Sequence, residues 1–290
     1  MKYAFISEYA HEHSVALMCK VLRVSRSGYY RFQHHVPSNR EEANVRLLKK
    51  IRRVHGQSRK TYGSPRVHRE LLKQGHPCGR HRVARLMAKE GIVGKIRRRY
   101  RATTRQSRTA QASPDLVQRE FTATRPHQIW TSDITYIWTE EGWLYLAVIL
   151  DVFSRAIVGW ATSAHIDAAL VCSAFGRAVA QYRPGLRVIF HSDRGSQYTS
   201  KMFRDLLGAQ QVPFLQSNGL SCYDNAITES FFHTLKSEAI VFEHFRTREE
   251  AHGYLFDYIE VFYNQYRLHS SIGYRTPREV MQGIINNKAA

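Results

Sequence analysis

Three acidic residues in the second half of the sequence could together support chemistry on a phosphodiester. Asp133, Asp193 and Glu229 each lie among apolar or aromatic neighbours, where an ionised carboxylate is costly unless a cation accompanies it. Carboxylate oxygens suit Mg²⁺ or Mn²⁺, and two such ions about 3.5–4 Å apart can hold the attacking and leaving oxygens in line. Taken one at a time, these acids could be helix caps or surface ion pairs. Taken together, they predict a catalytic site in which Asp133, Asp193 and Glu229 bind two metal ions.

The helix expected around Glu229 adds groups that could handle DNA. Asn225, Glu229 and Lys236 stand at helical positions i−4, i and i+7, so they share one face with Phe232 and His233. A metal ligand, an amide and a lysine along one ridge would let a single helix hold both metal and DNA backbone.

The elements that must position these residues are predicted from periodicity. Segments rich in aromatic and β-branched residues predict strands, and apolar stripes at helical spacing predict helices. The expected strands are 128–138, 143–153, 156–162, 186–191 and 212–216, and the expected helices are 167–182, 200–209 and 224–240, the last capped by Asp224 or Asn225. Three consecutive strands followed by alternating helix and strand predict an α/β catalytic core of the ribonuclease-H-like type, with a mixed five-stranded sheet.

A further helix is predicted over residues 248–266, with an apolar stripe that is more typical of a core than of an interface. Asn264, Arg267 and His269 lie at and beyond its end. These three residues could brace the site or touch DNA, and we expect a mainly structural role with some DNA contact.

The charge of the chain is divided very unevenly. Residues 1–125 contain 29 Lys and Arg against 8 Asp and Glu, a net charge of +21, whereas residues 126–290 have a net charge of −2. This asymmetry indicates a polyanion partner for the first half, bound through phosphate neutralisation and counterion release. A basic face without any partner is unconvincing at this charge density.

The basic half has the pattern of all-α helix-turn-helix DNA-binding segments. Residues 7–32 predict a helix, a turn and a second helix capped by Ser25. A third helix at 40–54 carries apolar residues at 45, 48 and 51, and a helical pair follows it, with Val67, Leu71 and Leu72 on the core side of its first helix. Residues 95–108 contain seven Lys and Arg and no acid, which is typical of a basic linker. The candidate DNA contacts are Arg26 and Tyr29 in the first segment, Arg80, Arg82 and Arg85 in the second, and Arg97, Arg98 and Arg99 in the linker.

Other site classes are poorly supported. The four cysteines are scattered without zinc-finger spacing, so we expect reduced thiols rather than a zinc site or disulfides. The apolar stretch 143–152 is too short to span a bilayer, and the first residues do not resemble a signal peptide. We therefore expect a cytoplasmic, nucleoid-associated protein that binds no membrane.

Several motifs resemble the DDE transposases of the insertion-sequence-three family, within the retroviral-integrase superfamily. Thirty-five residues separate Asp193 from Glu229, the separation that defines this family and the retroviral integrases. The similar segments, in chain order, are Val24–Tyr30, Tyr62–Val67, His191–Tyr198, Tyr223–Lys236 and Tyr263–Ser270 with Thr276-Pro277. Ser217–Ser221 departs from the family's usual wording, which leaves the DNA contacts of that loop undecided.

The resemblance implies specific roles and partners. Asp133, Asp193 and Glu229 would be the metal ligands, Lys236 would contact DNA near the reacting phosphate, and Asn225 would lie beside the scissile strand. Tyr223 and His233 in the same motif, and Arg267, are further candidate DNA contacts. The partners would be the element's terminal inverted repeats and target DNA. The family also implies a multimer on paired ends, and a second-reading-frame subunit that can be fused to an upstream product with a helix-turn-helix and a coiled coil.

The predicted organisation has five parts. They are a helix-turn-helix segment (1–36), a second helical DNA-binding domain (37–95), a basic linker (96–125), the catalytic core (126–245) and a C-terminal helical extension (246–290). The expected function is that of a bacterial transposase that cleaves DNA strands and joins them without a covalent protein intermediate. Two alternatives stay open: a ribonuclease-H-like nuclease that does not join strands, and a DNA-binding repressor with an inactive catalytic half.

Overall fold

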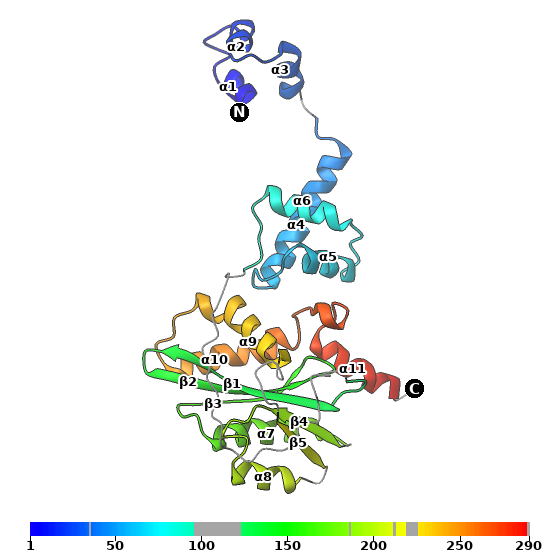
Figure 1. Cartoon of the computed structure of the whole chain (residues 1–290). Coiled ribbons are helices and arrows are strands. Elements are labelled where there is room, and N and C mark those ends of the chain that lie inside the picture. Colours follow the sequence, from blue (N-terminus) through cyan, green and yellow to red (C-terminus); the bar gives the residue numbers. More distant parts are fainter. Residues whose placement is uncertain (35, 96–122, 186, 211–212, 219–225, 289–290) are drawn as a thin grey trace.

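The computed structural model describes residues 1–34, 36–95, 123–185, 187–210, 213–218 and 226–288. Two helical units precede a sheet with helices on both of its faces (Figure 1). No helix in these ranges is long and apolar enough to cross a membrane. The three cysteines that they contain, Cys19, Cys78 and Cys172, are free thiols, as predicted.

The first helical unit is a small cluster with its own core. Its helices are α1 (Lys2–Glu8), α2 (Val15–Val21) and α3 (Arg26–Gln33). The predicted cap of α3 is confirmed, because the Gly28 N–H donates to Ser25 Oγ at 3.0 Å. The predicted start near residue 7 is wrong, since α1 precedes it and a turn separates α1 from α2. The hydrogen bonds and ring contacts described for residues 1–34 join residues of that segment to one another.

The second helical unit consists of α4 (Asn39–Gln57), α5 (Ser64–Lys73) and α6 (Arg80–Lys89). A reciprocal capping box between Ser38 and Glu41 fixes the start of α4. Val67 and Leu71 are buried as predicted, whereas Leu72, predicted on the core side, is exposed (40%), as is Val45 (56%). The stripes that are buried run through Leu47, Ile51 and Val54 on α4 and through Val67 and Leu71 on α5, and the two exposed positions lie off those stripes.

The sheet has the predicted five strands in the order β3-β2-β1-β4-β5. The strands are β1 (Ile129–Thr139), β2 (Gly142–Asp151), β3 (Ile157–Ser163), β4 (Val188–Ser192) and β5 (Phe214–Asn218). The first three form an antiparallel meander, and β4 pairs in parallel with both β1 and β5. The ribonuclease-H-like fold class, with its mixed sheet, is therefore confirmed.

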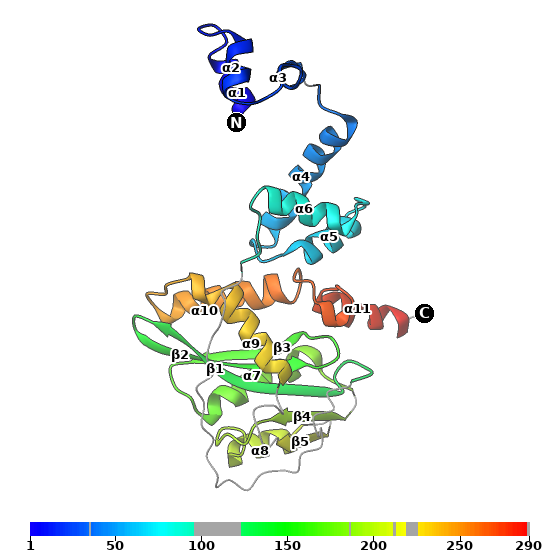
Figure 2. The same ribbon diagram turned by 45° about the horizontal axis from the view of Figure 1, so that its top comes forward.

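Alternation along β2 shows how the sheet is buried on both faces. Leu146 and Val148 face one hydrophobic cluster, while Ala147 and Ile149 face another. Helices α7 (Ala168–Tyr182) and α8 (Lys201–Gly208) cover the second cluster, and α9 (Ala226–Glu238) and α10 (Arg248–Phe256) cover the first (Figures 1 and 2). Residue 159 on β3 must be glycine, because a Cβ there would lie 2.4 Å from the Ala174 carbonyl oxygen of α7.

The C-terminal part belongs to the same core. The predicted helix 248–266 is interrupted: α10 gives way to a π-helical turn η3 (Asp257–Tyr263), whose side chains pack with β2 and α9. Short 3₁₀ turns η2 (Ile240–Phe242) and η4 (Ser270–Ile272) and helix α11 (Pro277–Lys288) complete it. The predicted core role of this stripe is confirmed.

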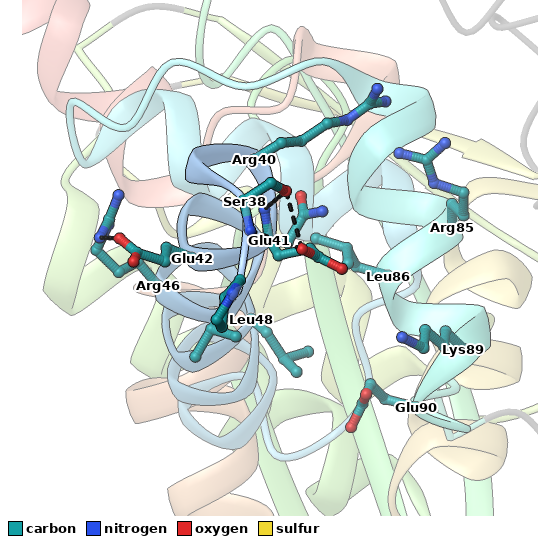
Figure 3. A pocket seen from close by; sticks show the side chains of 13 residues that line it. Ser38, Arg40, Glu41, Glu42, Arg46, Leu48, Arg85, Leu86, Lys89 and Glu90 are labelled. Carbon is teal, nitrogen blue, oxygen red and sulfur yellow. Dashed lines mark hydrogen bonds and ion pairs between the residues drawn. The ribbon is translucent and has the colours of Figure 1, made fainter. Parts of the chain in front are cut away.

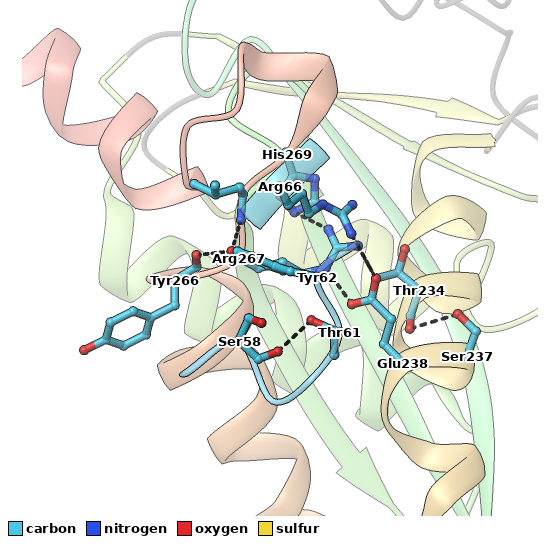
Figure 4. Close-up of polar contacts among 11 residues, drawn as sticks. Ser58, Thr61, Tyr62, Arg66, Thr234, Ser237, Glu238, Tyr266, Arg267 and His269 are labelled. Atoms are coloured by element: carbon cyan, nitrogen blue, oxygen red, sulfur yellow. Dashed lines mark hydrogen bonds and ion pairs between the residues drawn. The ribbon is translucent and has the colours of Figure 1, made fainter. Parts of the chain in front are cut away.

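The second helical unit is docked on this C-terminal part (Figure 4). The Tyr62 hydroxyl donates to the Tyr266 carbonyl and accepts from the Leu268 N–H, both at 2.8 Å. Leu268 also packs into the hydrophobic cluster of the helical unit. An ion pair of 2.8 Å joins Arg59 to Asp257. These contacts fix how α4–α6 are oriented relative to the sheet.

Candidate active site

Strand register brings two of the three predicted carboxylates to the same edge of the sheet. In the parallel pairing of β1 with β4, Thr131 lies opposite His191, so Asp133 and Asp193 stand two residues further along their respective chains. Asp133 accepts a hydrogen bond from the Ile134 N–H (2.8 Å), and Asp193 accepts one from the Gly195 N–H (3.0 Å). Both side chains are partly buried.

The third carboxylate is positioned by a contact between α9 and β1. The Thr228 hydroxyl donates to the Thr131 hydroxyl at 2.7 Å, and both residues are fully buried. Thr131 shares a face of β1 with Asp133, and Glu229 directly follows Thr228. In the last turn of α9, Lys236 Nζ lies 4.9 Å from the centroid of the Tyr136 ring. The helix therefore presents Glu229 and Lys236 toward the strand that carries Asp133.

The three carboxylates resist ionisation in this arrangement. Burial, then the nearby charges of Asp193 and Glu229, raise the pKa of Asp133 to about 7, although the Ile134 N–H and Lys236 act in the opposite direction. Burial also raises the pKa of Glu229 and that of Asp193. At Asp193, the hydrogen bond from the Gly195 N–H and the charge of His191 partly counter the effect of burial. Burial lowers the pKa of Lys236, and Tyr136 and Asp133 counter that effect. Negative charge is thus concentrated where solvent compensates it poorly.

Behind the carboxylates, a buried hydroxyl network holds the strands in place. Ser132 donates to the Val148 carbonyl at 2.9 Å, which leaves Ser132 Oγ to accept from the Tyr198 hydroxyl, also at 2.9 Å. Burial, with the charges of Asp133 and Asp193, raises the pKa of Tyr198 well above its usual value. Tyr198 therefore stays neutral and serves as a support between β1 and the segment after Asp193.

The donor set fits hard divalent cations. In the described part of the chain, no group of three His, Cys, Asp or Glu side chains is close enough together to hold a metal ion as it stands. Strand register nevertheless places Asp193 on the strand beside Asp133, and the Thr228–Thr131 contact brings Glu229 toward the same strand. A divalent cation would favour the ionised form of each of them, and oxygen ligands of this kind suit Mg²⁺ or Mn²⁺.

Other predicted contacts on and around α9 have mixed outcomes. Asn225 and Tyr223, like Arg97, Arg98 and Arg99, lie outside the described residues. His233 is exposed, one turn along α9 from Glu229, whereas Phe232 packs in the core and is 7% exposed. The helix face predicted to carry Glu229, Phe232, His233 and Lys236 together therefore does not include Phe232.

Two predicted DNA contacts are contradicted by burial. Tyr29 is 1% exposed and packs inside the first helical unit, because its ring closes the small core that α1, α2 and α3 share. Arg267 is 3% exposed and makes a two-pronged ion pair with Glu238 (2.6 and 2.8 Å). Neither side chain can reach DNA in this conformation. Arg267 has the structural role that its position also suggested.

Helix α6 presents the predicted arginines of the second helical unit unequally. Arg80 and Arg85 are exposed, whereas Arg82 is half-buried and its Nε donates to Asn44 Oδ1 at 2.8 Å. A groove of about 1010 Å³ runs between α4 and α6 (Figure 3). Arg85, Lys89 and Glu90 line its α6 side, and its α4 side also carries both basic and acidic side chains, so the groove is not a uniformly basic surface.

Sequence reasoning missed three groups that shape the site. Thr228 and Tyr198 act through hydroxyl contacts with β1, and Glu238 pairs with arginines that lie far away in the sequence. Only Thr228 had a local signal, since it lies beside Glu229 on a helix expected to face β1.

Family models and relatives match nearly the whole chain. A model described as an integrase core domain matches residues 123–215, a second integrase core domain matches 229–280, and an HTH-like domain matches 42–100. The transposase InsF for insertion sequence IS3A of Escherichia coli (strain K12) is 38% identical over 281 residues, covering 96% of this chain and 98% of the relative. An uncharacterized 31 kDa protein of insertion element IS600 from Shigella sonnei is 40% identical over 260 residues, covering 90% and 96%.

Among solved structures, the catalytic core domain of HTLV-2 integrase in complex with magnesium is 16% identical, with a TM-score of 0.43, over 55% of this chain and 99% of that one. The family assignment does not depend on this weak likeness, because the sequence matches extend over both the helical and the α/β parts. The chain belongs to the IS3 family of insertion-sequence transposases.

Proposed function

We propose that this protein is a DNA strand transferase that moves an insertion sequence, with Asp133, Asp193 and Glu229 as its catalytic, metal-binding residues. The observation that carries the proposal is the meeting of Asp133 with Asp193 and Glu229, where the pKa of Asp133 is raised to about 7. An acidic cluster of this kind is stabilised by cations. The family supports the choice of reaction.

The protein's own residues would divide the work as follows. The exposed arginines of α6 and the basic segment before the sheet would hold the element's ends and bring them to the carboxylates. Lys236, on the same helix as Glu229, would contact a phosphate oxygen of the bound strand. When bound, the two Mg²⁺ or Mn²⁺ ions would polarise the scissile phosphate and favour the deprotonated nucleophile. Water would be the nucleophile for cleavage, and a DNA 3′-hydroxyl for joining.

Covalent catalysis by a side chain is not needed in this scheme. The hydroxyl groups of Ser132 and Tyr198, behind the carboxylates, are buried and occupied by each other and by the Val148 carbonyl. A copy bound to each element end, and a second-reading-frame origin with an upstream fusion partner, also remain proposals drawn from the family.

The decisive experiment is a strand-transfer assay with Glu229→Gln on precleaved DNA that carries the ends flanking this reading frame. We expect cleavage and joining to be lost while binding of the ends is nearly unchanged, because the amide keeps the shape of the side chain and removes its charge. Full joining by this variant would refute the assignment. Cleavage without joining by the wild type would indicate a nuclease, and metal-independent binding with neither activity would indicate a repressor.

A further inference from the structure

A second polar site lies on the other side of α9, away from the carboxylates. It is a pocket of about 370 Å³, with walls from α5, the turn after β2, α9 and the segment 267–271. Arg66, Arg155 and Arg267 supply its guanidiniums, and its hydroxyls include those of Ser230, Thr234 and Ser271. No Asp or Glu of the described chain lines it. Every polar side chain just named can donate a hydrogen bond.

Positive charge exceeds negative charge around this pocket. Arg66 and Arg267 share one carboxylate, Glu238, at 3.4 and 2.6 Å (Figure 4). Burial lowers the pKa of Arg155, and the charge of Asp151 partly counters that effect by favouring the charged form. Both oxygens of Asp151 already accept hydrogen bonds, one from Ser154 and the other from the His127 N–H. Three guanidiniums therefore face two carboxylates, and neither carboxylate reaches the lining.

Arg155 is the least satisfied group of this site. Its Nε is buried and has no hydrogen-bond partner in the described part of the chain. Its backbone is left-handed, with φ of 65°, a conformation that residues with a Cβ seldom adopt because the Cβ crowds the backbone. The turn is held there by the Asp151–Ser154 hydrogen bonds of 2.6 and 2.8 Å. A strained arginine with an unpaired buried nitrogen points to a ligand that is an anion.

His269 adds a neutral donor rather than a fourth charge. Burial, followed by the charges of Arg267, Arg66 and Arg155, lowers the pKa of His269 to about 2. Its Nε2 lies 3.0 Å from Arg267 Nη1, and arginine can only donate, so Nε2 accepts and the proton is on Nδ1. The ring can therefore donate to an anion without increasing the repulsion among the arginines.

We propose that this pocket binds a backbone phosphate of DNA, at a position separate from the scissile phosphate. Placement favours a polymer over a small anion. Arg66 belongs to the HTH-like unit, and Ser230 directly follows Glu229 on α9, so a strand running from that unit to the carboxylates passes the pocket. The proposal rests on the proposed function only in taking DNA as the polyanion.

The test is the salt dependence of DNA binding by the full-length protein without divalent metal, on a random-sequence duplex. Each neutralised phosphate contributes about 0.9 to the slope of log K against log salt. Asparagine tolerates a left-handed backbone, so Arg155→Asn should keep the turn and lower the slope by about that amount. Arg204→Asn is the matched control, because Arg204 is exposed on α8 across the sheet, and its slope should equal that of the wild type.

A second pair of variants covers a failure of Arg155→Asn to fold. Ser271 is exposed at the rim, so Ser271→Glu should lower the slope through repulsion. Ser271→Ala removes a hydroxyl but no charge, so it should weaken binding at most and leave the slope as in the wild type. An unchanged slope in folded Arg155→Asn, or in Ser271→Glu, would overturn the proposal. A site for a free anion would also overturn it. In that case inorganic phosphate would raise the melting temperature of the wild type but not that of Arg155→Asn, and the two proteins would have equal slopes. Because no strand is cut in this assay, its outcome does not depend on catalysis.

Discussion

Acidic side chains gather on one side of helix α9, and basic side chains gather on the other. Toward β1, burial raises the pKa values of Asp133, Asp193 and Glu229, so these carboxylates resist ionisation. Toward the second helical unit, burial lowers the pKa of Arg66 and Arg155, although the Glu238 carboxylate opposes this effect at Arg66. Helix α9 thus lies between the proposed metal site and the proposed phosphate site, and it links the positions of the two.

The arginine side should show the largest effect when its counter-ion is removed. Glu238 is 7% exposed and pairs with both Arg267 and Arg66, so Glu238→Ala leaves two guanidiniums without that partner. We expect a loss of about 3–5 kcal/mol in the free energy of unfolding, measured with urea. Glu249→Ala, at an exposed position of α10, should change it little. Added phosphate should restore part of the loss, and a loss no larger than that of the control would contradict this account.

The carboxylate side should respond to pH in the opposite way to most acids. The pKa of Asp133 is about 7 in the folded state against 3.8 for an ordinary aspartate, so its contribution to stability is complete below pH 3.8 and is lost as the pH rises through about 7. Asp133→Asn avoids that loss. Without metal, the variant should be more stable than the wild type at pH 8, by at most about 4 kcal/mol, and equal to it near pH 4.

Thermal unfolding across this pH range, with and without Mg²⁺, measures the difference. Mg²⁺ should stabilise the wild type at pH 8 more than it stabilises Asp133→Asn, because the ion favours the ionised carboxylate. A stability difference that does not vary with pH would show that Asp133 is not held among other negative charges.

The sequence carried enough information for the carboxylate side but not for the arginine side. Asp133 and Asp193 follow apolar strands whose pairing could be anticipated, and the motif around Glu229 is local to one helix. The contacts of Glu238, in contrast, join residues 29 and 172 positions apart. Periodicity reports which face of an element is buried, and it does not report which distant element meets that face.

Burial also reversed two predictions that relied on residue type. Tyr29 and Arg267 belong to types that often contact DNA, yet both are used inside the protein. In the first helical unit, a tyrosine must fill a core that few apolar residues share. At Arg267, the buried Glu238 requires a partner, so the guanidinium turns inward.

One hydroxyl makes two of the hydrogen bonds that dock the second helical unit, and its removal should have an intermediate effect. Tyr62→Phe leaves the Leu268 N–H and the Tyr266 carbonyl without this partner. We expect a loss of about 1–3 kcal/mol and faster hydrogen exchange at the Leu268 amide. Tyr30→Phe, at an exposed position of α3, is the matched control and should change neither quantity. Unchanged exchange at Leu268 in Tyr62→Phe would mean that the contact does not hold the two parts together.

The smallest expected effect on stability tests whether α9 is held on the carboxylate side as firmly as the contacts indicate. Thr228→Val removes the hydroxyl that donates to Thr131 Oγ1, which costs about 0.5–1.5 kcal/mol of stability. Strand transfer should fall more than stability implies, since a small shift of Glu229 disturbs the arrangement of the carboxylates. In a cycle with Thr131→Val, the double variant should lose less than the sum of the single losses, because both changes remove the same contact. Additive losses in stability and activity would mean that α9 is positioned by its apolar face alone.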